Sequence, residues 1–334
     1  MKKILGIFGL LVAVLGLTIS MDPAFASGYS LEHLLQRSSL YAIISIGAAV
    51  VIITGGIDLS IGSVVGLVGV LLPLLVRAED NEVLPGYGWP VPLAVAFVMF
   101  ISVAIGLLHG LLVTKLRLQP FIVTLCGLMI YRGLARLVAS DTQQGFQSEF
   151  TALRQIAKAR FPVPGIENFA IPAPAVFVLV IAVAAAVFLN LTIYGRYLFA
   201  LGRNELATKF SGIKTDRMVI LAYVISAFLA GLTGVLFVLD INSAPPSSFG
   251  ETYELWAIAA AVLGGCSLRG GEGTILGVVI GAAVLQVLRT AIVYVTNYQY
   301  IELLIIGIVL LVGVIADELV KRYAARRRAA RLAL

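Results

Sequence analysis

The chain has 334 residues, of which 60% are hydrophobic and 13% are charged, and its mean hydropathy is +1.01. No soluble core needs that much apolar surface, so the composition excludes a soluble globular protein. The formal net charge of +6 does not indicate nucleic-acid binding, because the basic residues lie in short blocks between apolar runs rather than on one polar face. We therefore expect an integral membrane protein whose basic blocks fix its orientation.

Apolar segments close to membrane-spanning length recur along the whole chain. A helix needs about 20 apolar residues to cross the hydrocarbon core, because each residue advances it by about 1.5 Å. The predicted spans are 4–20, 39–56, 59–76, 91–113, 121–139, 174–193, 219–239, 255–268, 274–292 and 300–317. These segments predict an all-α polytopic membrane protein with about ten transmembrane helices in a single transmembrane domain, 1–334.

The first predicted span has a second interpretation, as a cleavable signal peptide. Lys2 and Lys3 precede its apolar run, and Ala24-Phe25-Ala26 matches a cleavage site of the A-x-A type. We favour a retained helix, because an even number of spans places both ends of the chain on the same side of the membrane, in agreement with the charge pattern.

The distribution of the basic residues predicts the orientation. If the amino terminus is cytoplasmic, 16 of the 24 lysines and arginines fall in inside segments and five in outside segments. Cytoplasmic segments carry an excess of these residues, so we expect both termini in the cytoplasm. The segments outside the spans are then an external loop at 140–173 with a short helix from Thr151 to Ala159, a cytoplasmic segment at 195–217 and a basic cytoplasmic tail at 318–334.

Two glycine-rich places interrupt the pattern of simple spans. The connection at Gly55-Gly56-Ile57-Asp58 is too short for an ordinary loop, and the short span 255–268 ends among glycines. Irregular backbone at membrane depth is tolerated only where protein buries it or a watery cavity faces it, so broken or re-entrant helices often mark transport paths. Tight turns at the membrane interface are the alternative. The candidate residues for a translocation path or a broken helix are Gly55, Gly56, Asp58, Ser60, Arg132, Gly264, Gly265, Gly270 and Gly271.

Few ionisable side chains lie within the predicted spans. A carboxylate at Asp58 is costly unless it finds a partner, and with Ser60 it can cap the helix that follows. Arg132 and Arg136 share one helix face; Arg136 can reach the outer headgroups, whereas Arg132 needs a protein or water partner. His109 stands alone in an apolar helix, which is typical of a structural histidine that has its hydrogen bonds satisfied.

The sequence contains no motif of an enzyme. HExxH and GxSxG are absent, and so are paired intramembrane carboxylates. Cys126 and Cys266 lack CxxC spacing and a nearby histidine cluster, so they indicate neither a disulfide nor a metal site.

The cytoplasmic segment 195–217 contains a candidate docking element. Asn204 can cap a short helix that runs from Glu205 to Phe210, and Gly212 can end that helix in a left-handed turn. Leu206 and Phe210 then lie four residues apart on one helix face, and such an apolar pair beside charges suits a groove on another protein. A solvated basic loop that only fixes the topology is the alternative.

Four motifs, in order along the chain, resemble those of the permease subunits of ribose-type ABC sugar importers. Residues 51–66, VIITGGIDLSIGSVVG, are similar to the GGIDLS signature of that family, and residues 118–135 resemble the block that follows it. Residues 204–213, NELATKFSGI, are similar to N-E-x-A-A-x-x-S-G-I, and residues 253–273 are similar to Y-E-L…A-I-A-A…L-G-G-x-S-x-x-G-G-x-G. The likeness covers nearly the whole chain, with Thr208 in place of the usual alanine and Cys266 in place of the usual threonine.

The resemblance implies a permease with a fold similar to that of the vitamin B12 importer, in the bacterial inner membrane. It implies three kinds of partner: a second permease subunit, identical or homologous; ABC ATPase subunits; and a periplasmic binding protein that delivers a monosaccharide. The chain has no G-x-x-x-x-G-K-[ST] phosphate loop, so we expect a partner to hydrolyse ATP and this chain to need no cofactor. The implied ATPase-coupling residues are Arg203, Asn204, Glu205, Leu206, Ala207, Phe210, Ser211, Gly212 and Ile213.

Three other functions are alternatives. Importers of a nucleoside, an autoinducer or a branched-chain amino acid share this architecture. A secondary transporter would need an intramembrane charge relay, which the sequence does not reveal. A membrane scaffold without transport activity would tolerate disruption of the docking element.

Overall fold

The computed structural model describes residues 2–78, 86–165 and 169–296, together with residues 304, 307, 308, 311 and 315. Its elements, in chain order, are α1 (Lys2–Met21), the 3₁₀ helix η1 (Pro23–Ala26), α2 (Gly28–Ile53), α3 (Ile61–Val76), α4 (Val91–Lys115), α5 (Pro120–Val138), α6 (Thr151–Lys158), β1 (Arg160–Pro162), β2 (Ala170–Pro172), α7 (Ala173–Leu191), α8 (Ile193–Arg203), α9 (Glu205–Phe210), α10 (Thr215–Ile241), α11 (Tyr253–Leu263) and α12 (Ile275–Thr296).

Most of these helices are apolar. Six helices in the described part of the chain are long and apolar enough to cross a membrane, namely α2, α4, α5, α7, α10 and α12. Three more apolar helices are shorter: the Leu5–Met21 part of α1, together with α3 and α11. The chain is therefore a polytopic membrane protein. The predicted span 300–317 and the tail 318–334 lie outside the described residues, apart from five positions of that span.

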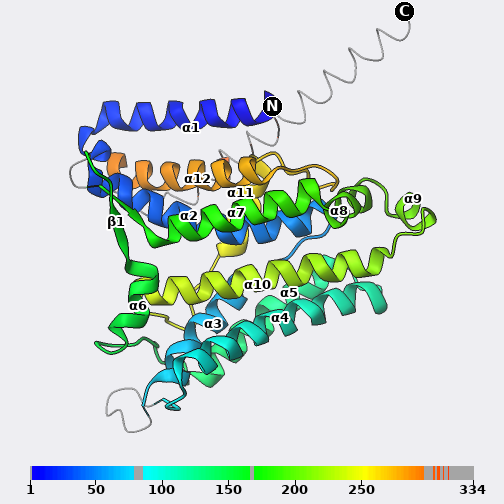
Figure 1. The fold of residues 1–334 in the computed structure, drawn as a ribbon, viewed down its shortest axis with the longest axis horizontal. Coiled ribbons are helices and arrows are strands. Elements are labelled where there is room, and N and C mark those ends of the chain that lie inside the picture. Colours follow the sequence, from blue (N-terminus) through cyan, green and yellow to red (C-terminus); the bar gives the residue numbers. More distant parts are fainter. Residues whose placement is uncertain are drawn as a thin grey trace, which may run out of the picture.

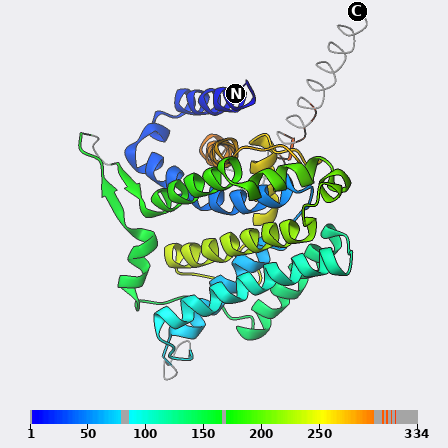
Figure 2. The same ribbon diagram turned by 45° about the vertical axis from the view of Figure 1, so that its right-hand side comes forward.

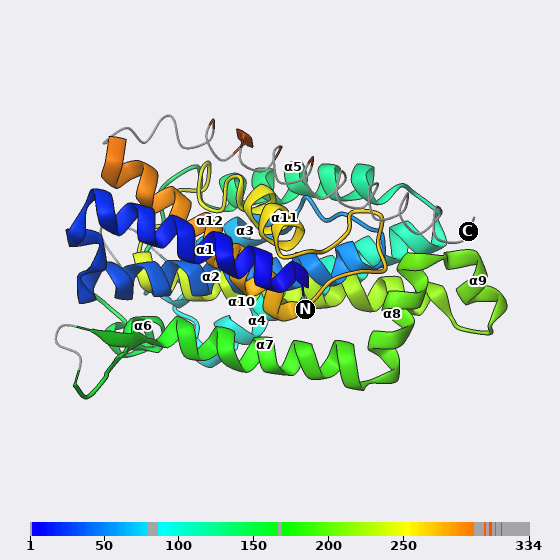
Figure 3. The ribbon, with the colours of Figure 1, turned by 90° about the horizontal axis from the view of Figure 1, so that it is seen from above.

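The long helices run between two ends of one bundle (Figure 1). One end carries α9, and the opposite end carries α6 and the β1–β2 hairpin; a turned view shows the same arrangement (Figure 2). We call them the α9 end and the α6 end. α10 lies inside the bundle and contacts α2, α3 and α4, whereas α1 packs on α12 at the outside (Figure 3). The core therefore lies around α2, α3 and α10.

The burial of the helices explains their composition. Every residue of α3 is buried, which accounts for a helix that is apolar on all sides. In α7, by contrast, Leu179 and Val180 are each 63% exposed. Apolar side chains on the outside of a membrane protein face lipid, so α7 has the surface expected of a helix at the periphery.

Two apolar helices that each follow a non-helical segment, α3 and α11, are too short to cross a membrane. α3 has 16 residues and α11 has 11, which at about 1.5 Å per residue gives about 24 and 17 Å, less than the hydrocarbon thickness of about 30 Å. α3 follows the non-helical linker 54–60, and α11 follows the non-helical segment 242–252. The predicted span 255–268 is therefore wrong in extent, because the helix begins at Tyr253 and ends at Leu263.

Other elements differ from the sequence predictions at their ends. α2 begins at Gly28, because Ser27 Oγ accepts a hydrogen bond from the backbone N–H of Ser30 (3.3 Å) and starts the helix before the apolar run. The sequence did not predict α8, whose first turn is capped by Thr192 Oγ1. The expected all-α fold differs in one detail, since β1 and β2 form a small antiparallel hairpin. The short helix expected near residue 151 is present as α6.

Candidate functional site

The linker 54–60 begins at a helix end that two glycines make possible. Gly55 has φ +84°, in the left-handed region that favours glycine. A Cβ atom at Gly56 would lie 3.0 Å from Val51 Cγ1 and 3.1 Å from Tyr223 Oη, so a larger residue would crowd both neighbours. The Gly-Gly pair therefore ends α2 and turns the chain towards α3.

Asp58 lies in this linker and is 3% exposed. Its Oδ1 accepts hydrogen bonds from the backbone N–H of Ser60 (3.0 Å) and from Ser60 Oγ (2.6 Å), and its Oδ2 accepts one from Ser226 Oγ of α10 (2.8 Å). Ser60 is the N-cap residue of α3, but its side chain makes no capping hydrogen bond and donates to Asp58 instead. Asp58 thus fixes the linker to α10 rather than only capping α3.

Side chains of α4 and α5 extend these contacts. Ser60 Oγ lies 3.5 Å from His109 Nδ1, and His109 Nε2 lies 2.9 Å from Tyr131 Oη. His109 is 2% exposed, and both ring nitrogens have a neighbour, as the interpretation of a structural histidine predicts. We call Asp58, Ser60, His109, Tyr131 and Ser226 the central polar network. Because it is enclosed, it holds the break between α2 and α3 in one geometry.

Arg132 finds its partner in the protein backbone. Its Nη1 donates to the carbonyl oxygens of Pro246 (3.1 Å) and Phe249 (2.6 Å), in the segment between α10 and α11. Gly66 of α3 permits this approach, since a Cβ atom there would lie 2.9 Å from Arg132 Nη1. Arg132 therefore joins α5 to the segment that precedes the short helix α11.

Arg136, one turn further along α5, pairs with Asp141 in the segment between α5 and α6. Its guanidinium donates to both carboxylate oxygens, at 2.9 and 2.7 Å, in an exposed position. These hydrogen bonds lower the pKa of Asp141, so the pair persists until the pH falls into the acid range.

Arg77 is 1% exposed at the end of α3, and the sequence did not indicate it as a candidate residue. Its guanidinium donates to Gln144 Oε1 (2.5 Å) and to the carbonyl oxygen of Gly145 (3.1 Å). Burial lowers the pKa of Arg77, and the negative charge of Glu149 partly opposes this shift. Arg77 ties residues 144–145 to α3, and no local sequence pattern signals this role because its partners are 67 and 68 residues away.

The glycines between α11 and α12 serve two purposes. At Gly264 a Cβ atom would lie 2.6 Å from the backbone of Gly277, so Gly264 allows the two helices to cross closely. Gly265, Gly270 and Gly271 have φ values of +91°, +83° and +73°, which other residues rarely adopt. We call residues 264–273 the glycine loop. The structure places Gly270 of this loop beside Gly55 of the linker, and Gly271 beside Ile53 at the end of α2.

α9 has the local structure that the sequence predicts. Asn204 Oδ1 accepts a hydrogen bond from the backbone N–H of Ala207 (2.9 Å), and Gly212 has φ +81°. Leu206 is 68% exposed and Phe210 is 88% exposed. α9 lies at the end of the bundle, beyond α8 (Figure 1), so these two exposed side chains form an apolar pair there. Ser211 and Ile213 complete the turn into α10, and Ile213 is partly buried.

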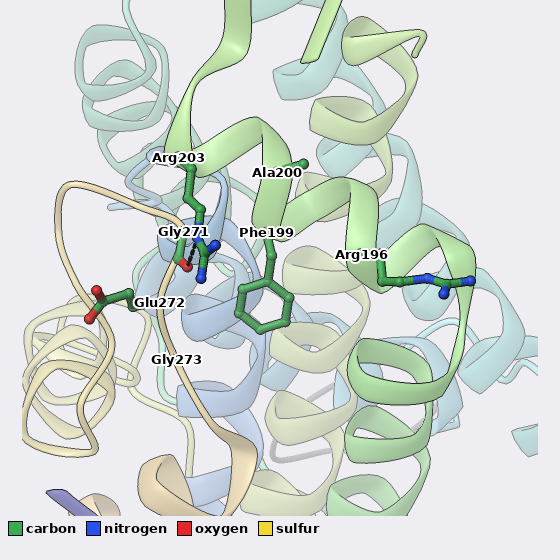
Figure 4. A pocket seen from close by; sticks show the side chains of 7 residues that line it. All are labelled: Arg196, Phe199, Ala200, Arg203, Gly271, Glu272 and Gly273. Carbon is green, nitrogen blue, oxygen red and sulfur yellow. Dashed lines mark hydrogen bonds between the residues drawn. The ribbon is translucent and has the colours of Figure 1, made fainter. Parts of the chain in front are cut away.

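An open cavity of about 580 Å³ lies between α8 and the glycine loop. In Figure 4 the side chain of Arg203 points towards Gly271, while Arg196 points away from it. The lining residues are Arg196, Phe199, Ala200, Arg203, Gly271, Glu272 and Gly273. Within the described residues, no cluster of three or more His, Cys, Asp or Glu side chains could hold a metal ion.

Comparisons with known proteins identify the family of this chain. A family model described as "Branched-chain amino acid transport system / permease component" matches residues 30–314. The chain is 34% identical over 310 residues to the ribose import permease protein RbsC of Escherichia coli (strain K12), covering 92% of this chain and 91% of that protein. It is 34% identical over 332 residues to the galactose/methyl galactoside import permease protein MglC of the same strain, covering 96% and 95%. It is 33% identical over 326 residues to the RbsC protein of Bacillus subtilis (strain 168), covering 95% and 93%. No solved structure matches the chain. The match over most of its length shows that the chain belongs to the family of permease components of the branched-chain amino acid transport system type.

Proposed function

We propose that the chain is the transmembrane permease subunit of an ATP-driven importer that moves a monosaccharide, ribose or a related sugar, into the cytoplasm. One observation carries the proposal: relatives named as ribose and galactose import permeases align with more than nine-tenths of the chain at about one-third identity. Because the family description names branched-chain amino acids, that class of solute is the second candidate.

The proposed architecture has about ten transmembrane helices, a fold similar to that of the vitamin B12 importer, and both termini in the cytoplasm of a bacterium, with the chain in the inner membrane. The excess of basic residues in the predicted inside segments supports this orientation. The α9 end then faces the cytoplasm and the α6 end faces the periplasm, where the binding protein delivers the solute. A second permease subunit, identical or homologous, completes the path.

α9 is the proposed contact with the ATPase subunits. Its exposed Leu206 and Phe210 suit insertion into an apolar groove, and residues Arg203 to Ile213 surround them. An apolar pair that is exposed to water at the end of a membrane protein favours a protein partner over a solvated loop. The ATPase supplies the energy, since this chain has no phosphate-binding loop.

Two breaks between helices border the proposed translocation path: the linker 54–60 between α2 and α3, and the glycine loop between α11 and α12. The candidate residues Asp58 and Ser60 are buried and hydrogen-bonded, so we assign them to the shape of the backbone rather than to solute contact. The glycines at 55–56 lie in the first break and those at 264–265 and 270–271 in the second, while Arg132 holds the segment that precedes α11. A path with few polar contacts binds the solute weakly, and only a weak site lets the ATPase shift the equilibrium towards release.

Transport by the reconstituted complex tests this function. The full chain is placed in lipid vesicles with its ATPase and binding protein, and uptake of labelled ribose, galactose and leucine is measured. We expect uptake of a sugar that needs both ATP and the binding protein and that a protonophore does not abolish. Uptake of leucine alone would support the second candidate, and uptake that fails with a protonophore while ATP is held constant would contradict an ATP-driven importer.

A further inference from the structure

Three backbone segments meet next to α9. They are the end of α2, the end of α8 and the glycine loop. The backbone N–H of Gly271 donates to the carbonyl oxygen of Ile53 (2.8 Å). A Cβ atom at Gly202 would overlap both Ile53 and Gly271, and one at Gly270 would lie 2.9 Å from the backbone nitrogen of Gly55. We call Ile53, Gly55, Gly202, Gly270 and Gly271 the glycine junction.

The junction leaves no space for side chains between the three segments. A Cβ atom at Gly270 would also lie 2.8 Å from the carbonyl oxygen of Gly202, and one at Gly271 would lie 2.9 Å from the backbone nitrogen of Arg203. Contacts between backbones cannot adjust by changing a side-chain rotamer. A displacement of any one segment must therefore displace the others or break the contact.

The junction is directly connected to the docking element. Gly202 precedes Asn204, the N-cap residue of α9, by two residues. Between them, Arg203 Nε donates to the carbonyl oxygen of Gly271 (3.4 Å), the contact drawn in Figure 4. α8 and α9 also pack on each other. A movement of α9 therefore reaches Gly202 through a single turn of chain.

On its other side, the junction connects to both interrupted helices. From Gly55 the linker leads to Asp58, which is bonded to α10, and then into α3. From Gly270 the glycine loop leads back to α11 and forward to α12. The two breaks in the helical bundle thus share one contact point with α8.

We propose that the glycine junction transmits movement of α9 to both interrupted helices, with Gly202 and Arg203 as positioning residues of import. The inference rests on the proposed function, since it assumes that an ATPase moves α9. Physical intermediacy alone does not establish coupling, which requires an element whose state both sites change. The linker and the glycine loop are these elements, and they change together when α9 moves.

The first experiment substitutes Gly202→Ala in the reconstituted complex, with Gly16→Ala as the matched control because a Cβ atom at Gly16 meets nothing within 4 Å. Because the added Cβ displaces backbone of α2 and the glycine loop but not α9, we expect G202A to co-purify with the ATPase, while import falls at least tenfold and the solute imported per ATP hydrolysed falls at least fivefold. Import by G202A within twofold of the wild type would overturn the proposal. Loss of import together with loss of ATPase co-purification would also overturn it, because the defect would then be one of docking.

A second pair of variants decides the case in which G202A does not fold. Arg203→Ala and Arg196→Ala each remove one arginine of α8 that lines the same cavity. Only R203A removes the hydrogen bond to the carbonyl oxygen of Gly271. We expect R203A to lower the ratio of solute imported to ATP hydrolysed at least twofold relative to R196A. Equal ratios in the two variants would overturn the proposal.

Hydrogen exchange separates this inference from the proposed function, because it needs no transport. In the purified chain, G202A should raise the exchange rate in peptides that cover 54–60 and 264–273 at least fivefold over G16A, and R203A should raise it over R196A. If the wild type imports no tested solute, the proposed function fails and exchange alone decides whether the junction holds. Unchanged exchange in both peptides would overturn the junction even if sugar import is confirmed.

Discussion

Asp58 illustrates how a charged side chain is accommodated in an apolar bundle. A buried carboxylate that lacks partners is strongly destabilising, and Asp58 avoids this cost with three hydrogen bonds from Ser60 and Ser226. The charge of Arg132 is stabilised by the backbone instead, since two backbone carbonyls accept its hydrogen bonds. Asp58 lies in a non-helical linker that it fixes to α10, and Arg132 binds the non-helical segment that precedes α11, so each pairing helps to hold a break between helices.

Replacing Asp58 tests whether the central polar network holds the linker. Asp58→Ala leaves the backbone N–H of Ser60 without an acceptor and removes the bond to α10, so we expect a loss of stability on the order of 3 kcal/mol. Asp58→Asn keeps an acceptor for Ser60 and can donate to Ser226, so its loss should be close to that of Ser226→Ala, which removes one hydrogen bond to the carboxylate, at about 2 kcal/mol. In thermal unfolding of the purified chain in detergent, the midpoint temperature should therefore be highest for the wild type, lower for S226A and D58N, and lowest for D58A. An equal loss in D58N and D58A would show that the charge of Asp58 matters more than its hydrogen bonds.

At the scale of elements, local signals in the sequence predicted local structure well. Asn204 and Gly212 are cap residues within a few positions of the helix they bound, and α9 begins and ends where they indicate. The two glycines at 55–56 likewise predicted the end of α2. Each of these features depends on the backbone preference of a residue at that position.

Features that depend on distant contacts could not be predicted in this way. The apolar pattern continues past Leu263, but the helix ends there while the chain turns to place Gly264 against Gly277 and Gly271 against Ile53. Similarly, Ser226 lies 168 residues from Asp58 in the sequence, so the partner of that carboxylate became apparent only in the fold. Because Ser226 and Tyr131 join the central polar network only through distant contacts, the sequence indicated Asp58 and Ser60 as candidates but neither of these two residues.

Gly212 provides a test of α9 as a docking element. Valine at φ +81° is strained, at a cost of about 1–3 kcal/mol, so Gly212→Val should distort the end of α9. Asparagine tolerates this conformation, which makes Gly212→Asn the matched control. We expect G212V to insert normally but to recover at least fivefold less ATPase in a pull-down, with a corresponding fall in uptake, while G212N behaves like the wild type. Normal recovery of ATPase and normal uptake in G212V would contradict the docking role of α9.

For the whole molecule, the two ends of the bundle differ in a way that agrees with an importer. The α9 end carries an exposed helix with an apolar pair and the glycine junction behind it. At the α6 end, Arg77 and Asn242 hold residues 144–147 across the ends of α3 and α10. One end therefore presents an exposed helix and the other holds a loop in place, as expected if the ATPase binds at the α9 end and the binding protein at the α6 end.

Cysteine labelling determines which end faces the cytoplasm. In a background in which Cys126 and Cys266 are replaced by alanine, Ser148→Cys places an exposed thiol at the α6 end and Lys209→Cys places one on α9. A membrane-impermeant maleimide applied to spheroplasts should label S148C, whereas K209C should be labelled only after lysis, because the excess of basic residues keeps the α9 end inside. The two variants control for each other, since lysis exposes both thiols and shows that each can react. Labelling of K209C in intact spheroplasts would show that the orientation is the opposite of the one proposed. α9 would then lie outside the cytoplasm and could not contact an ATPase there.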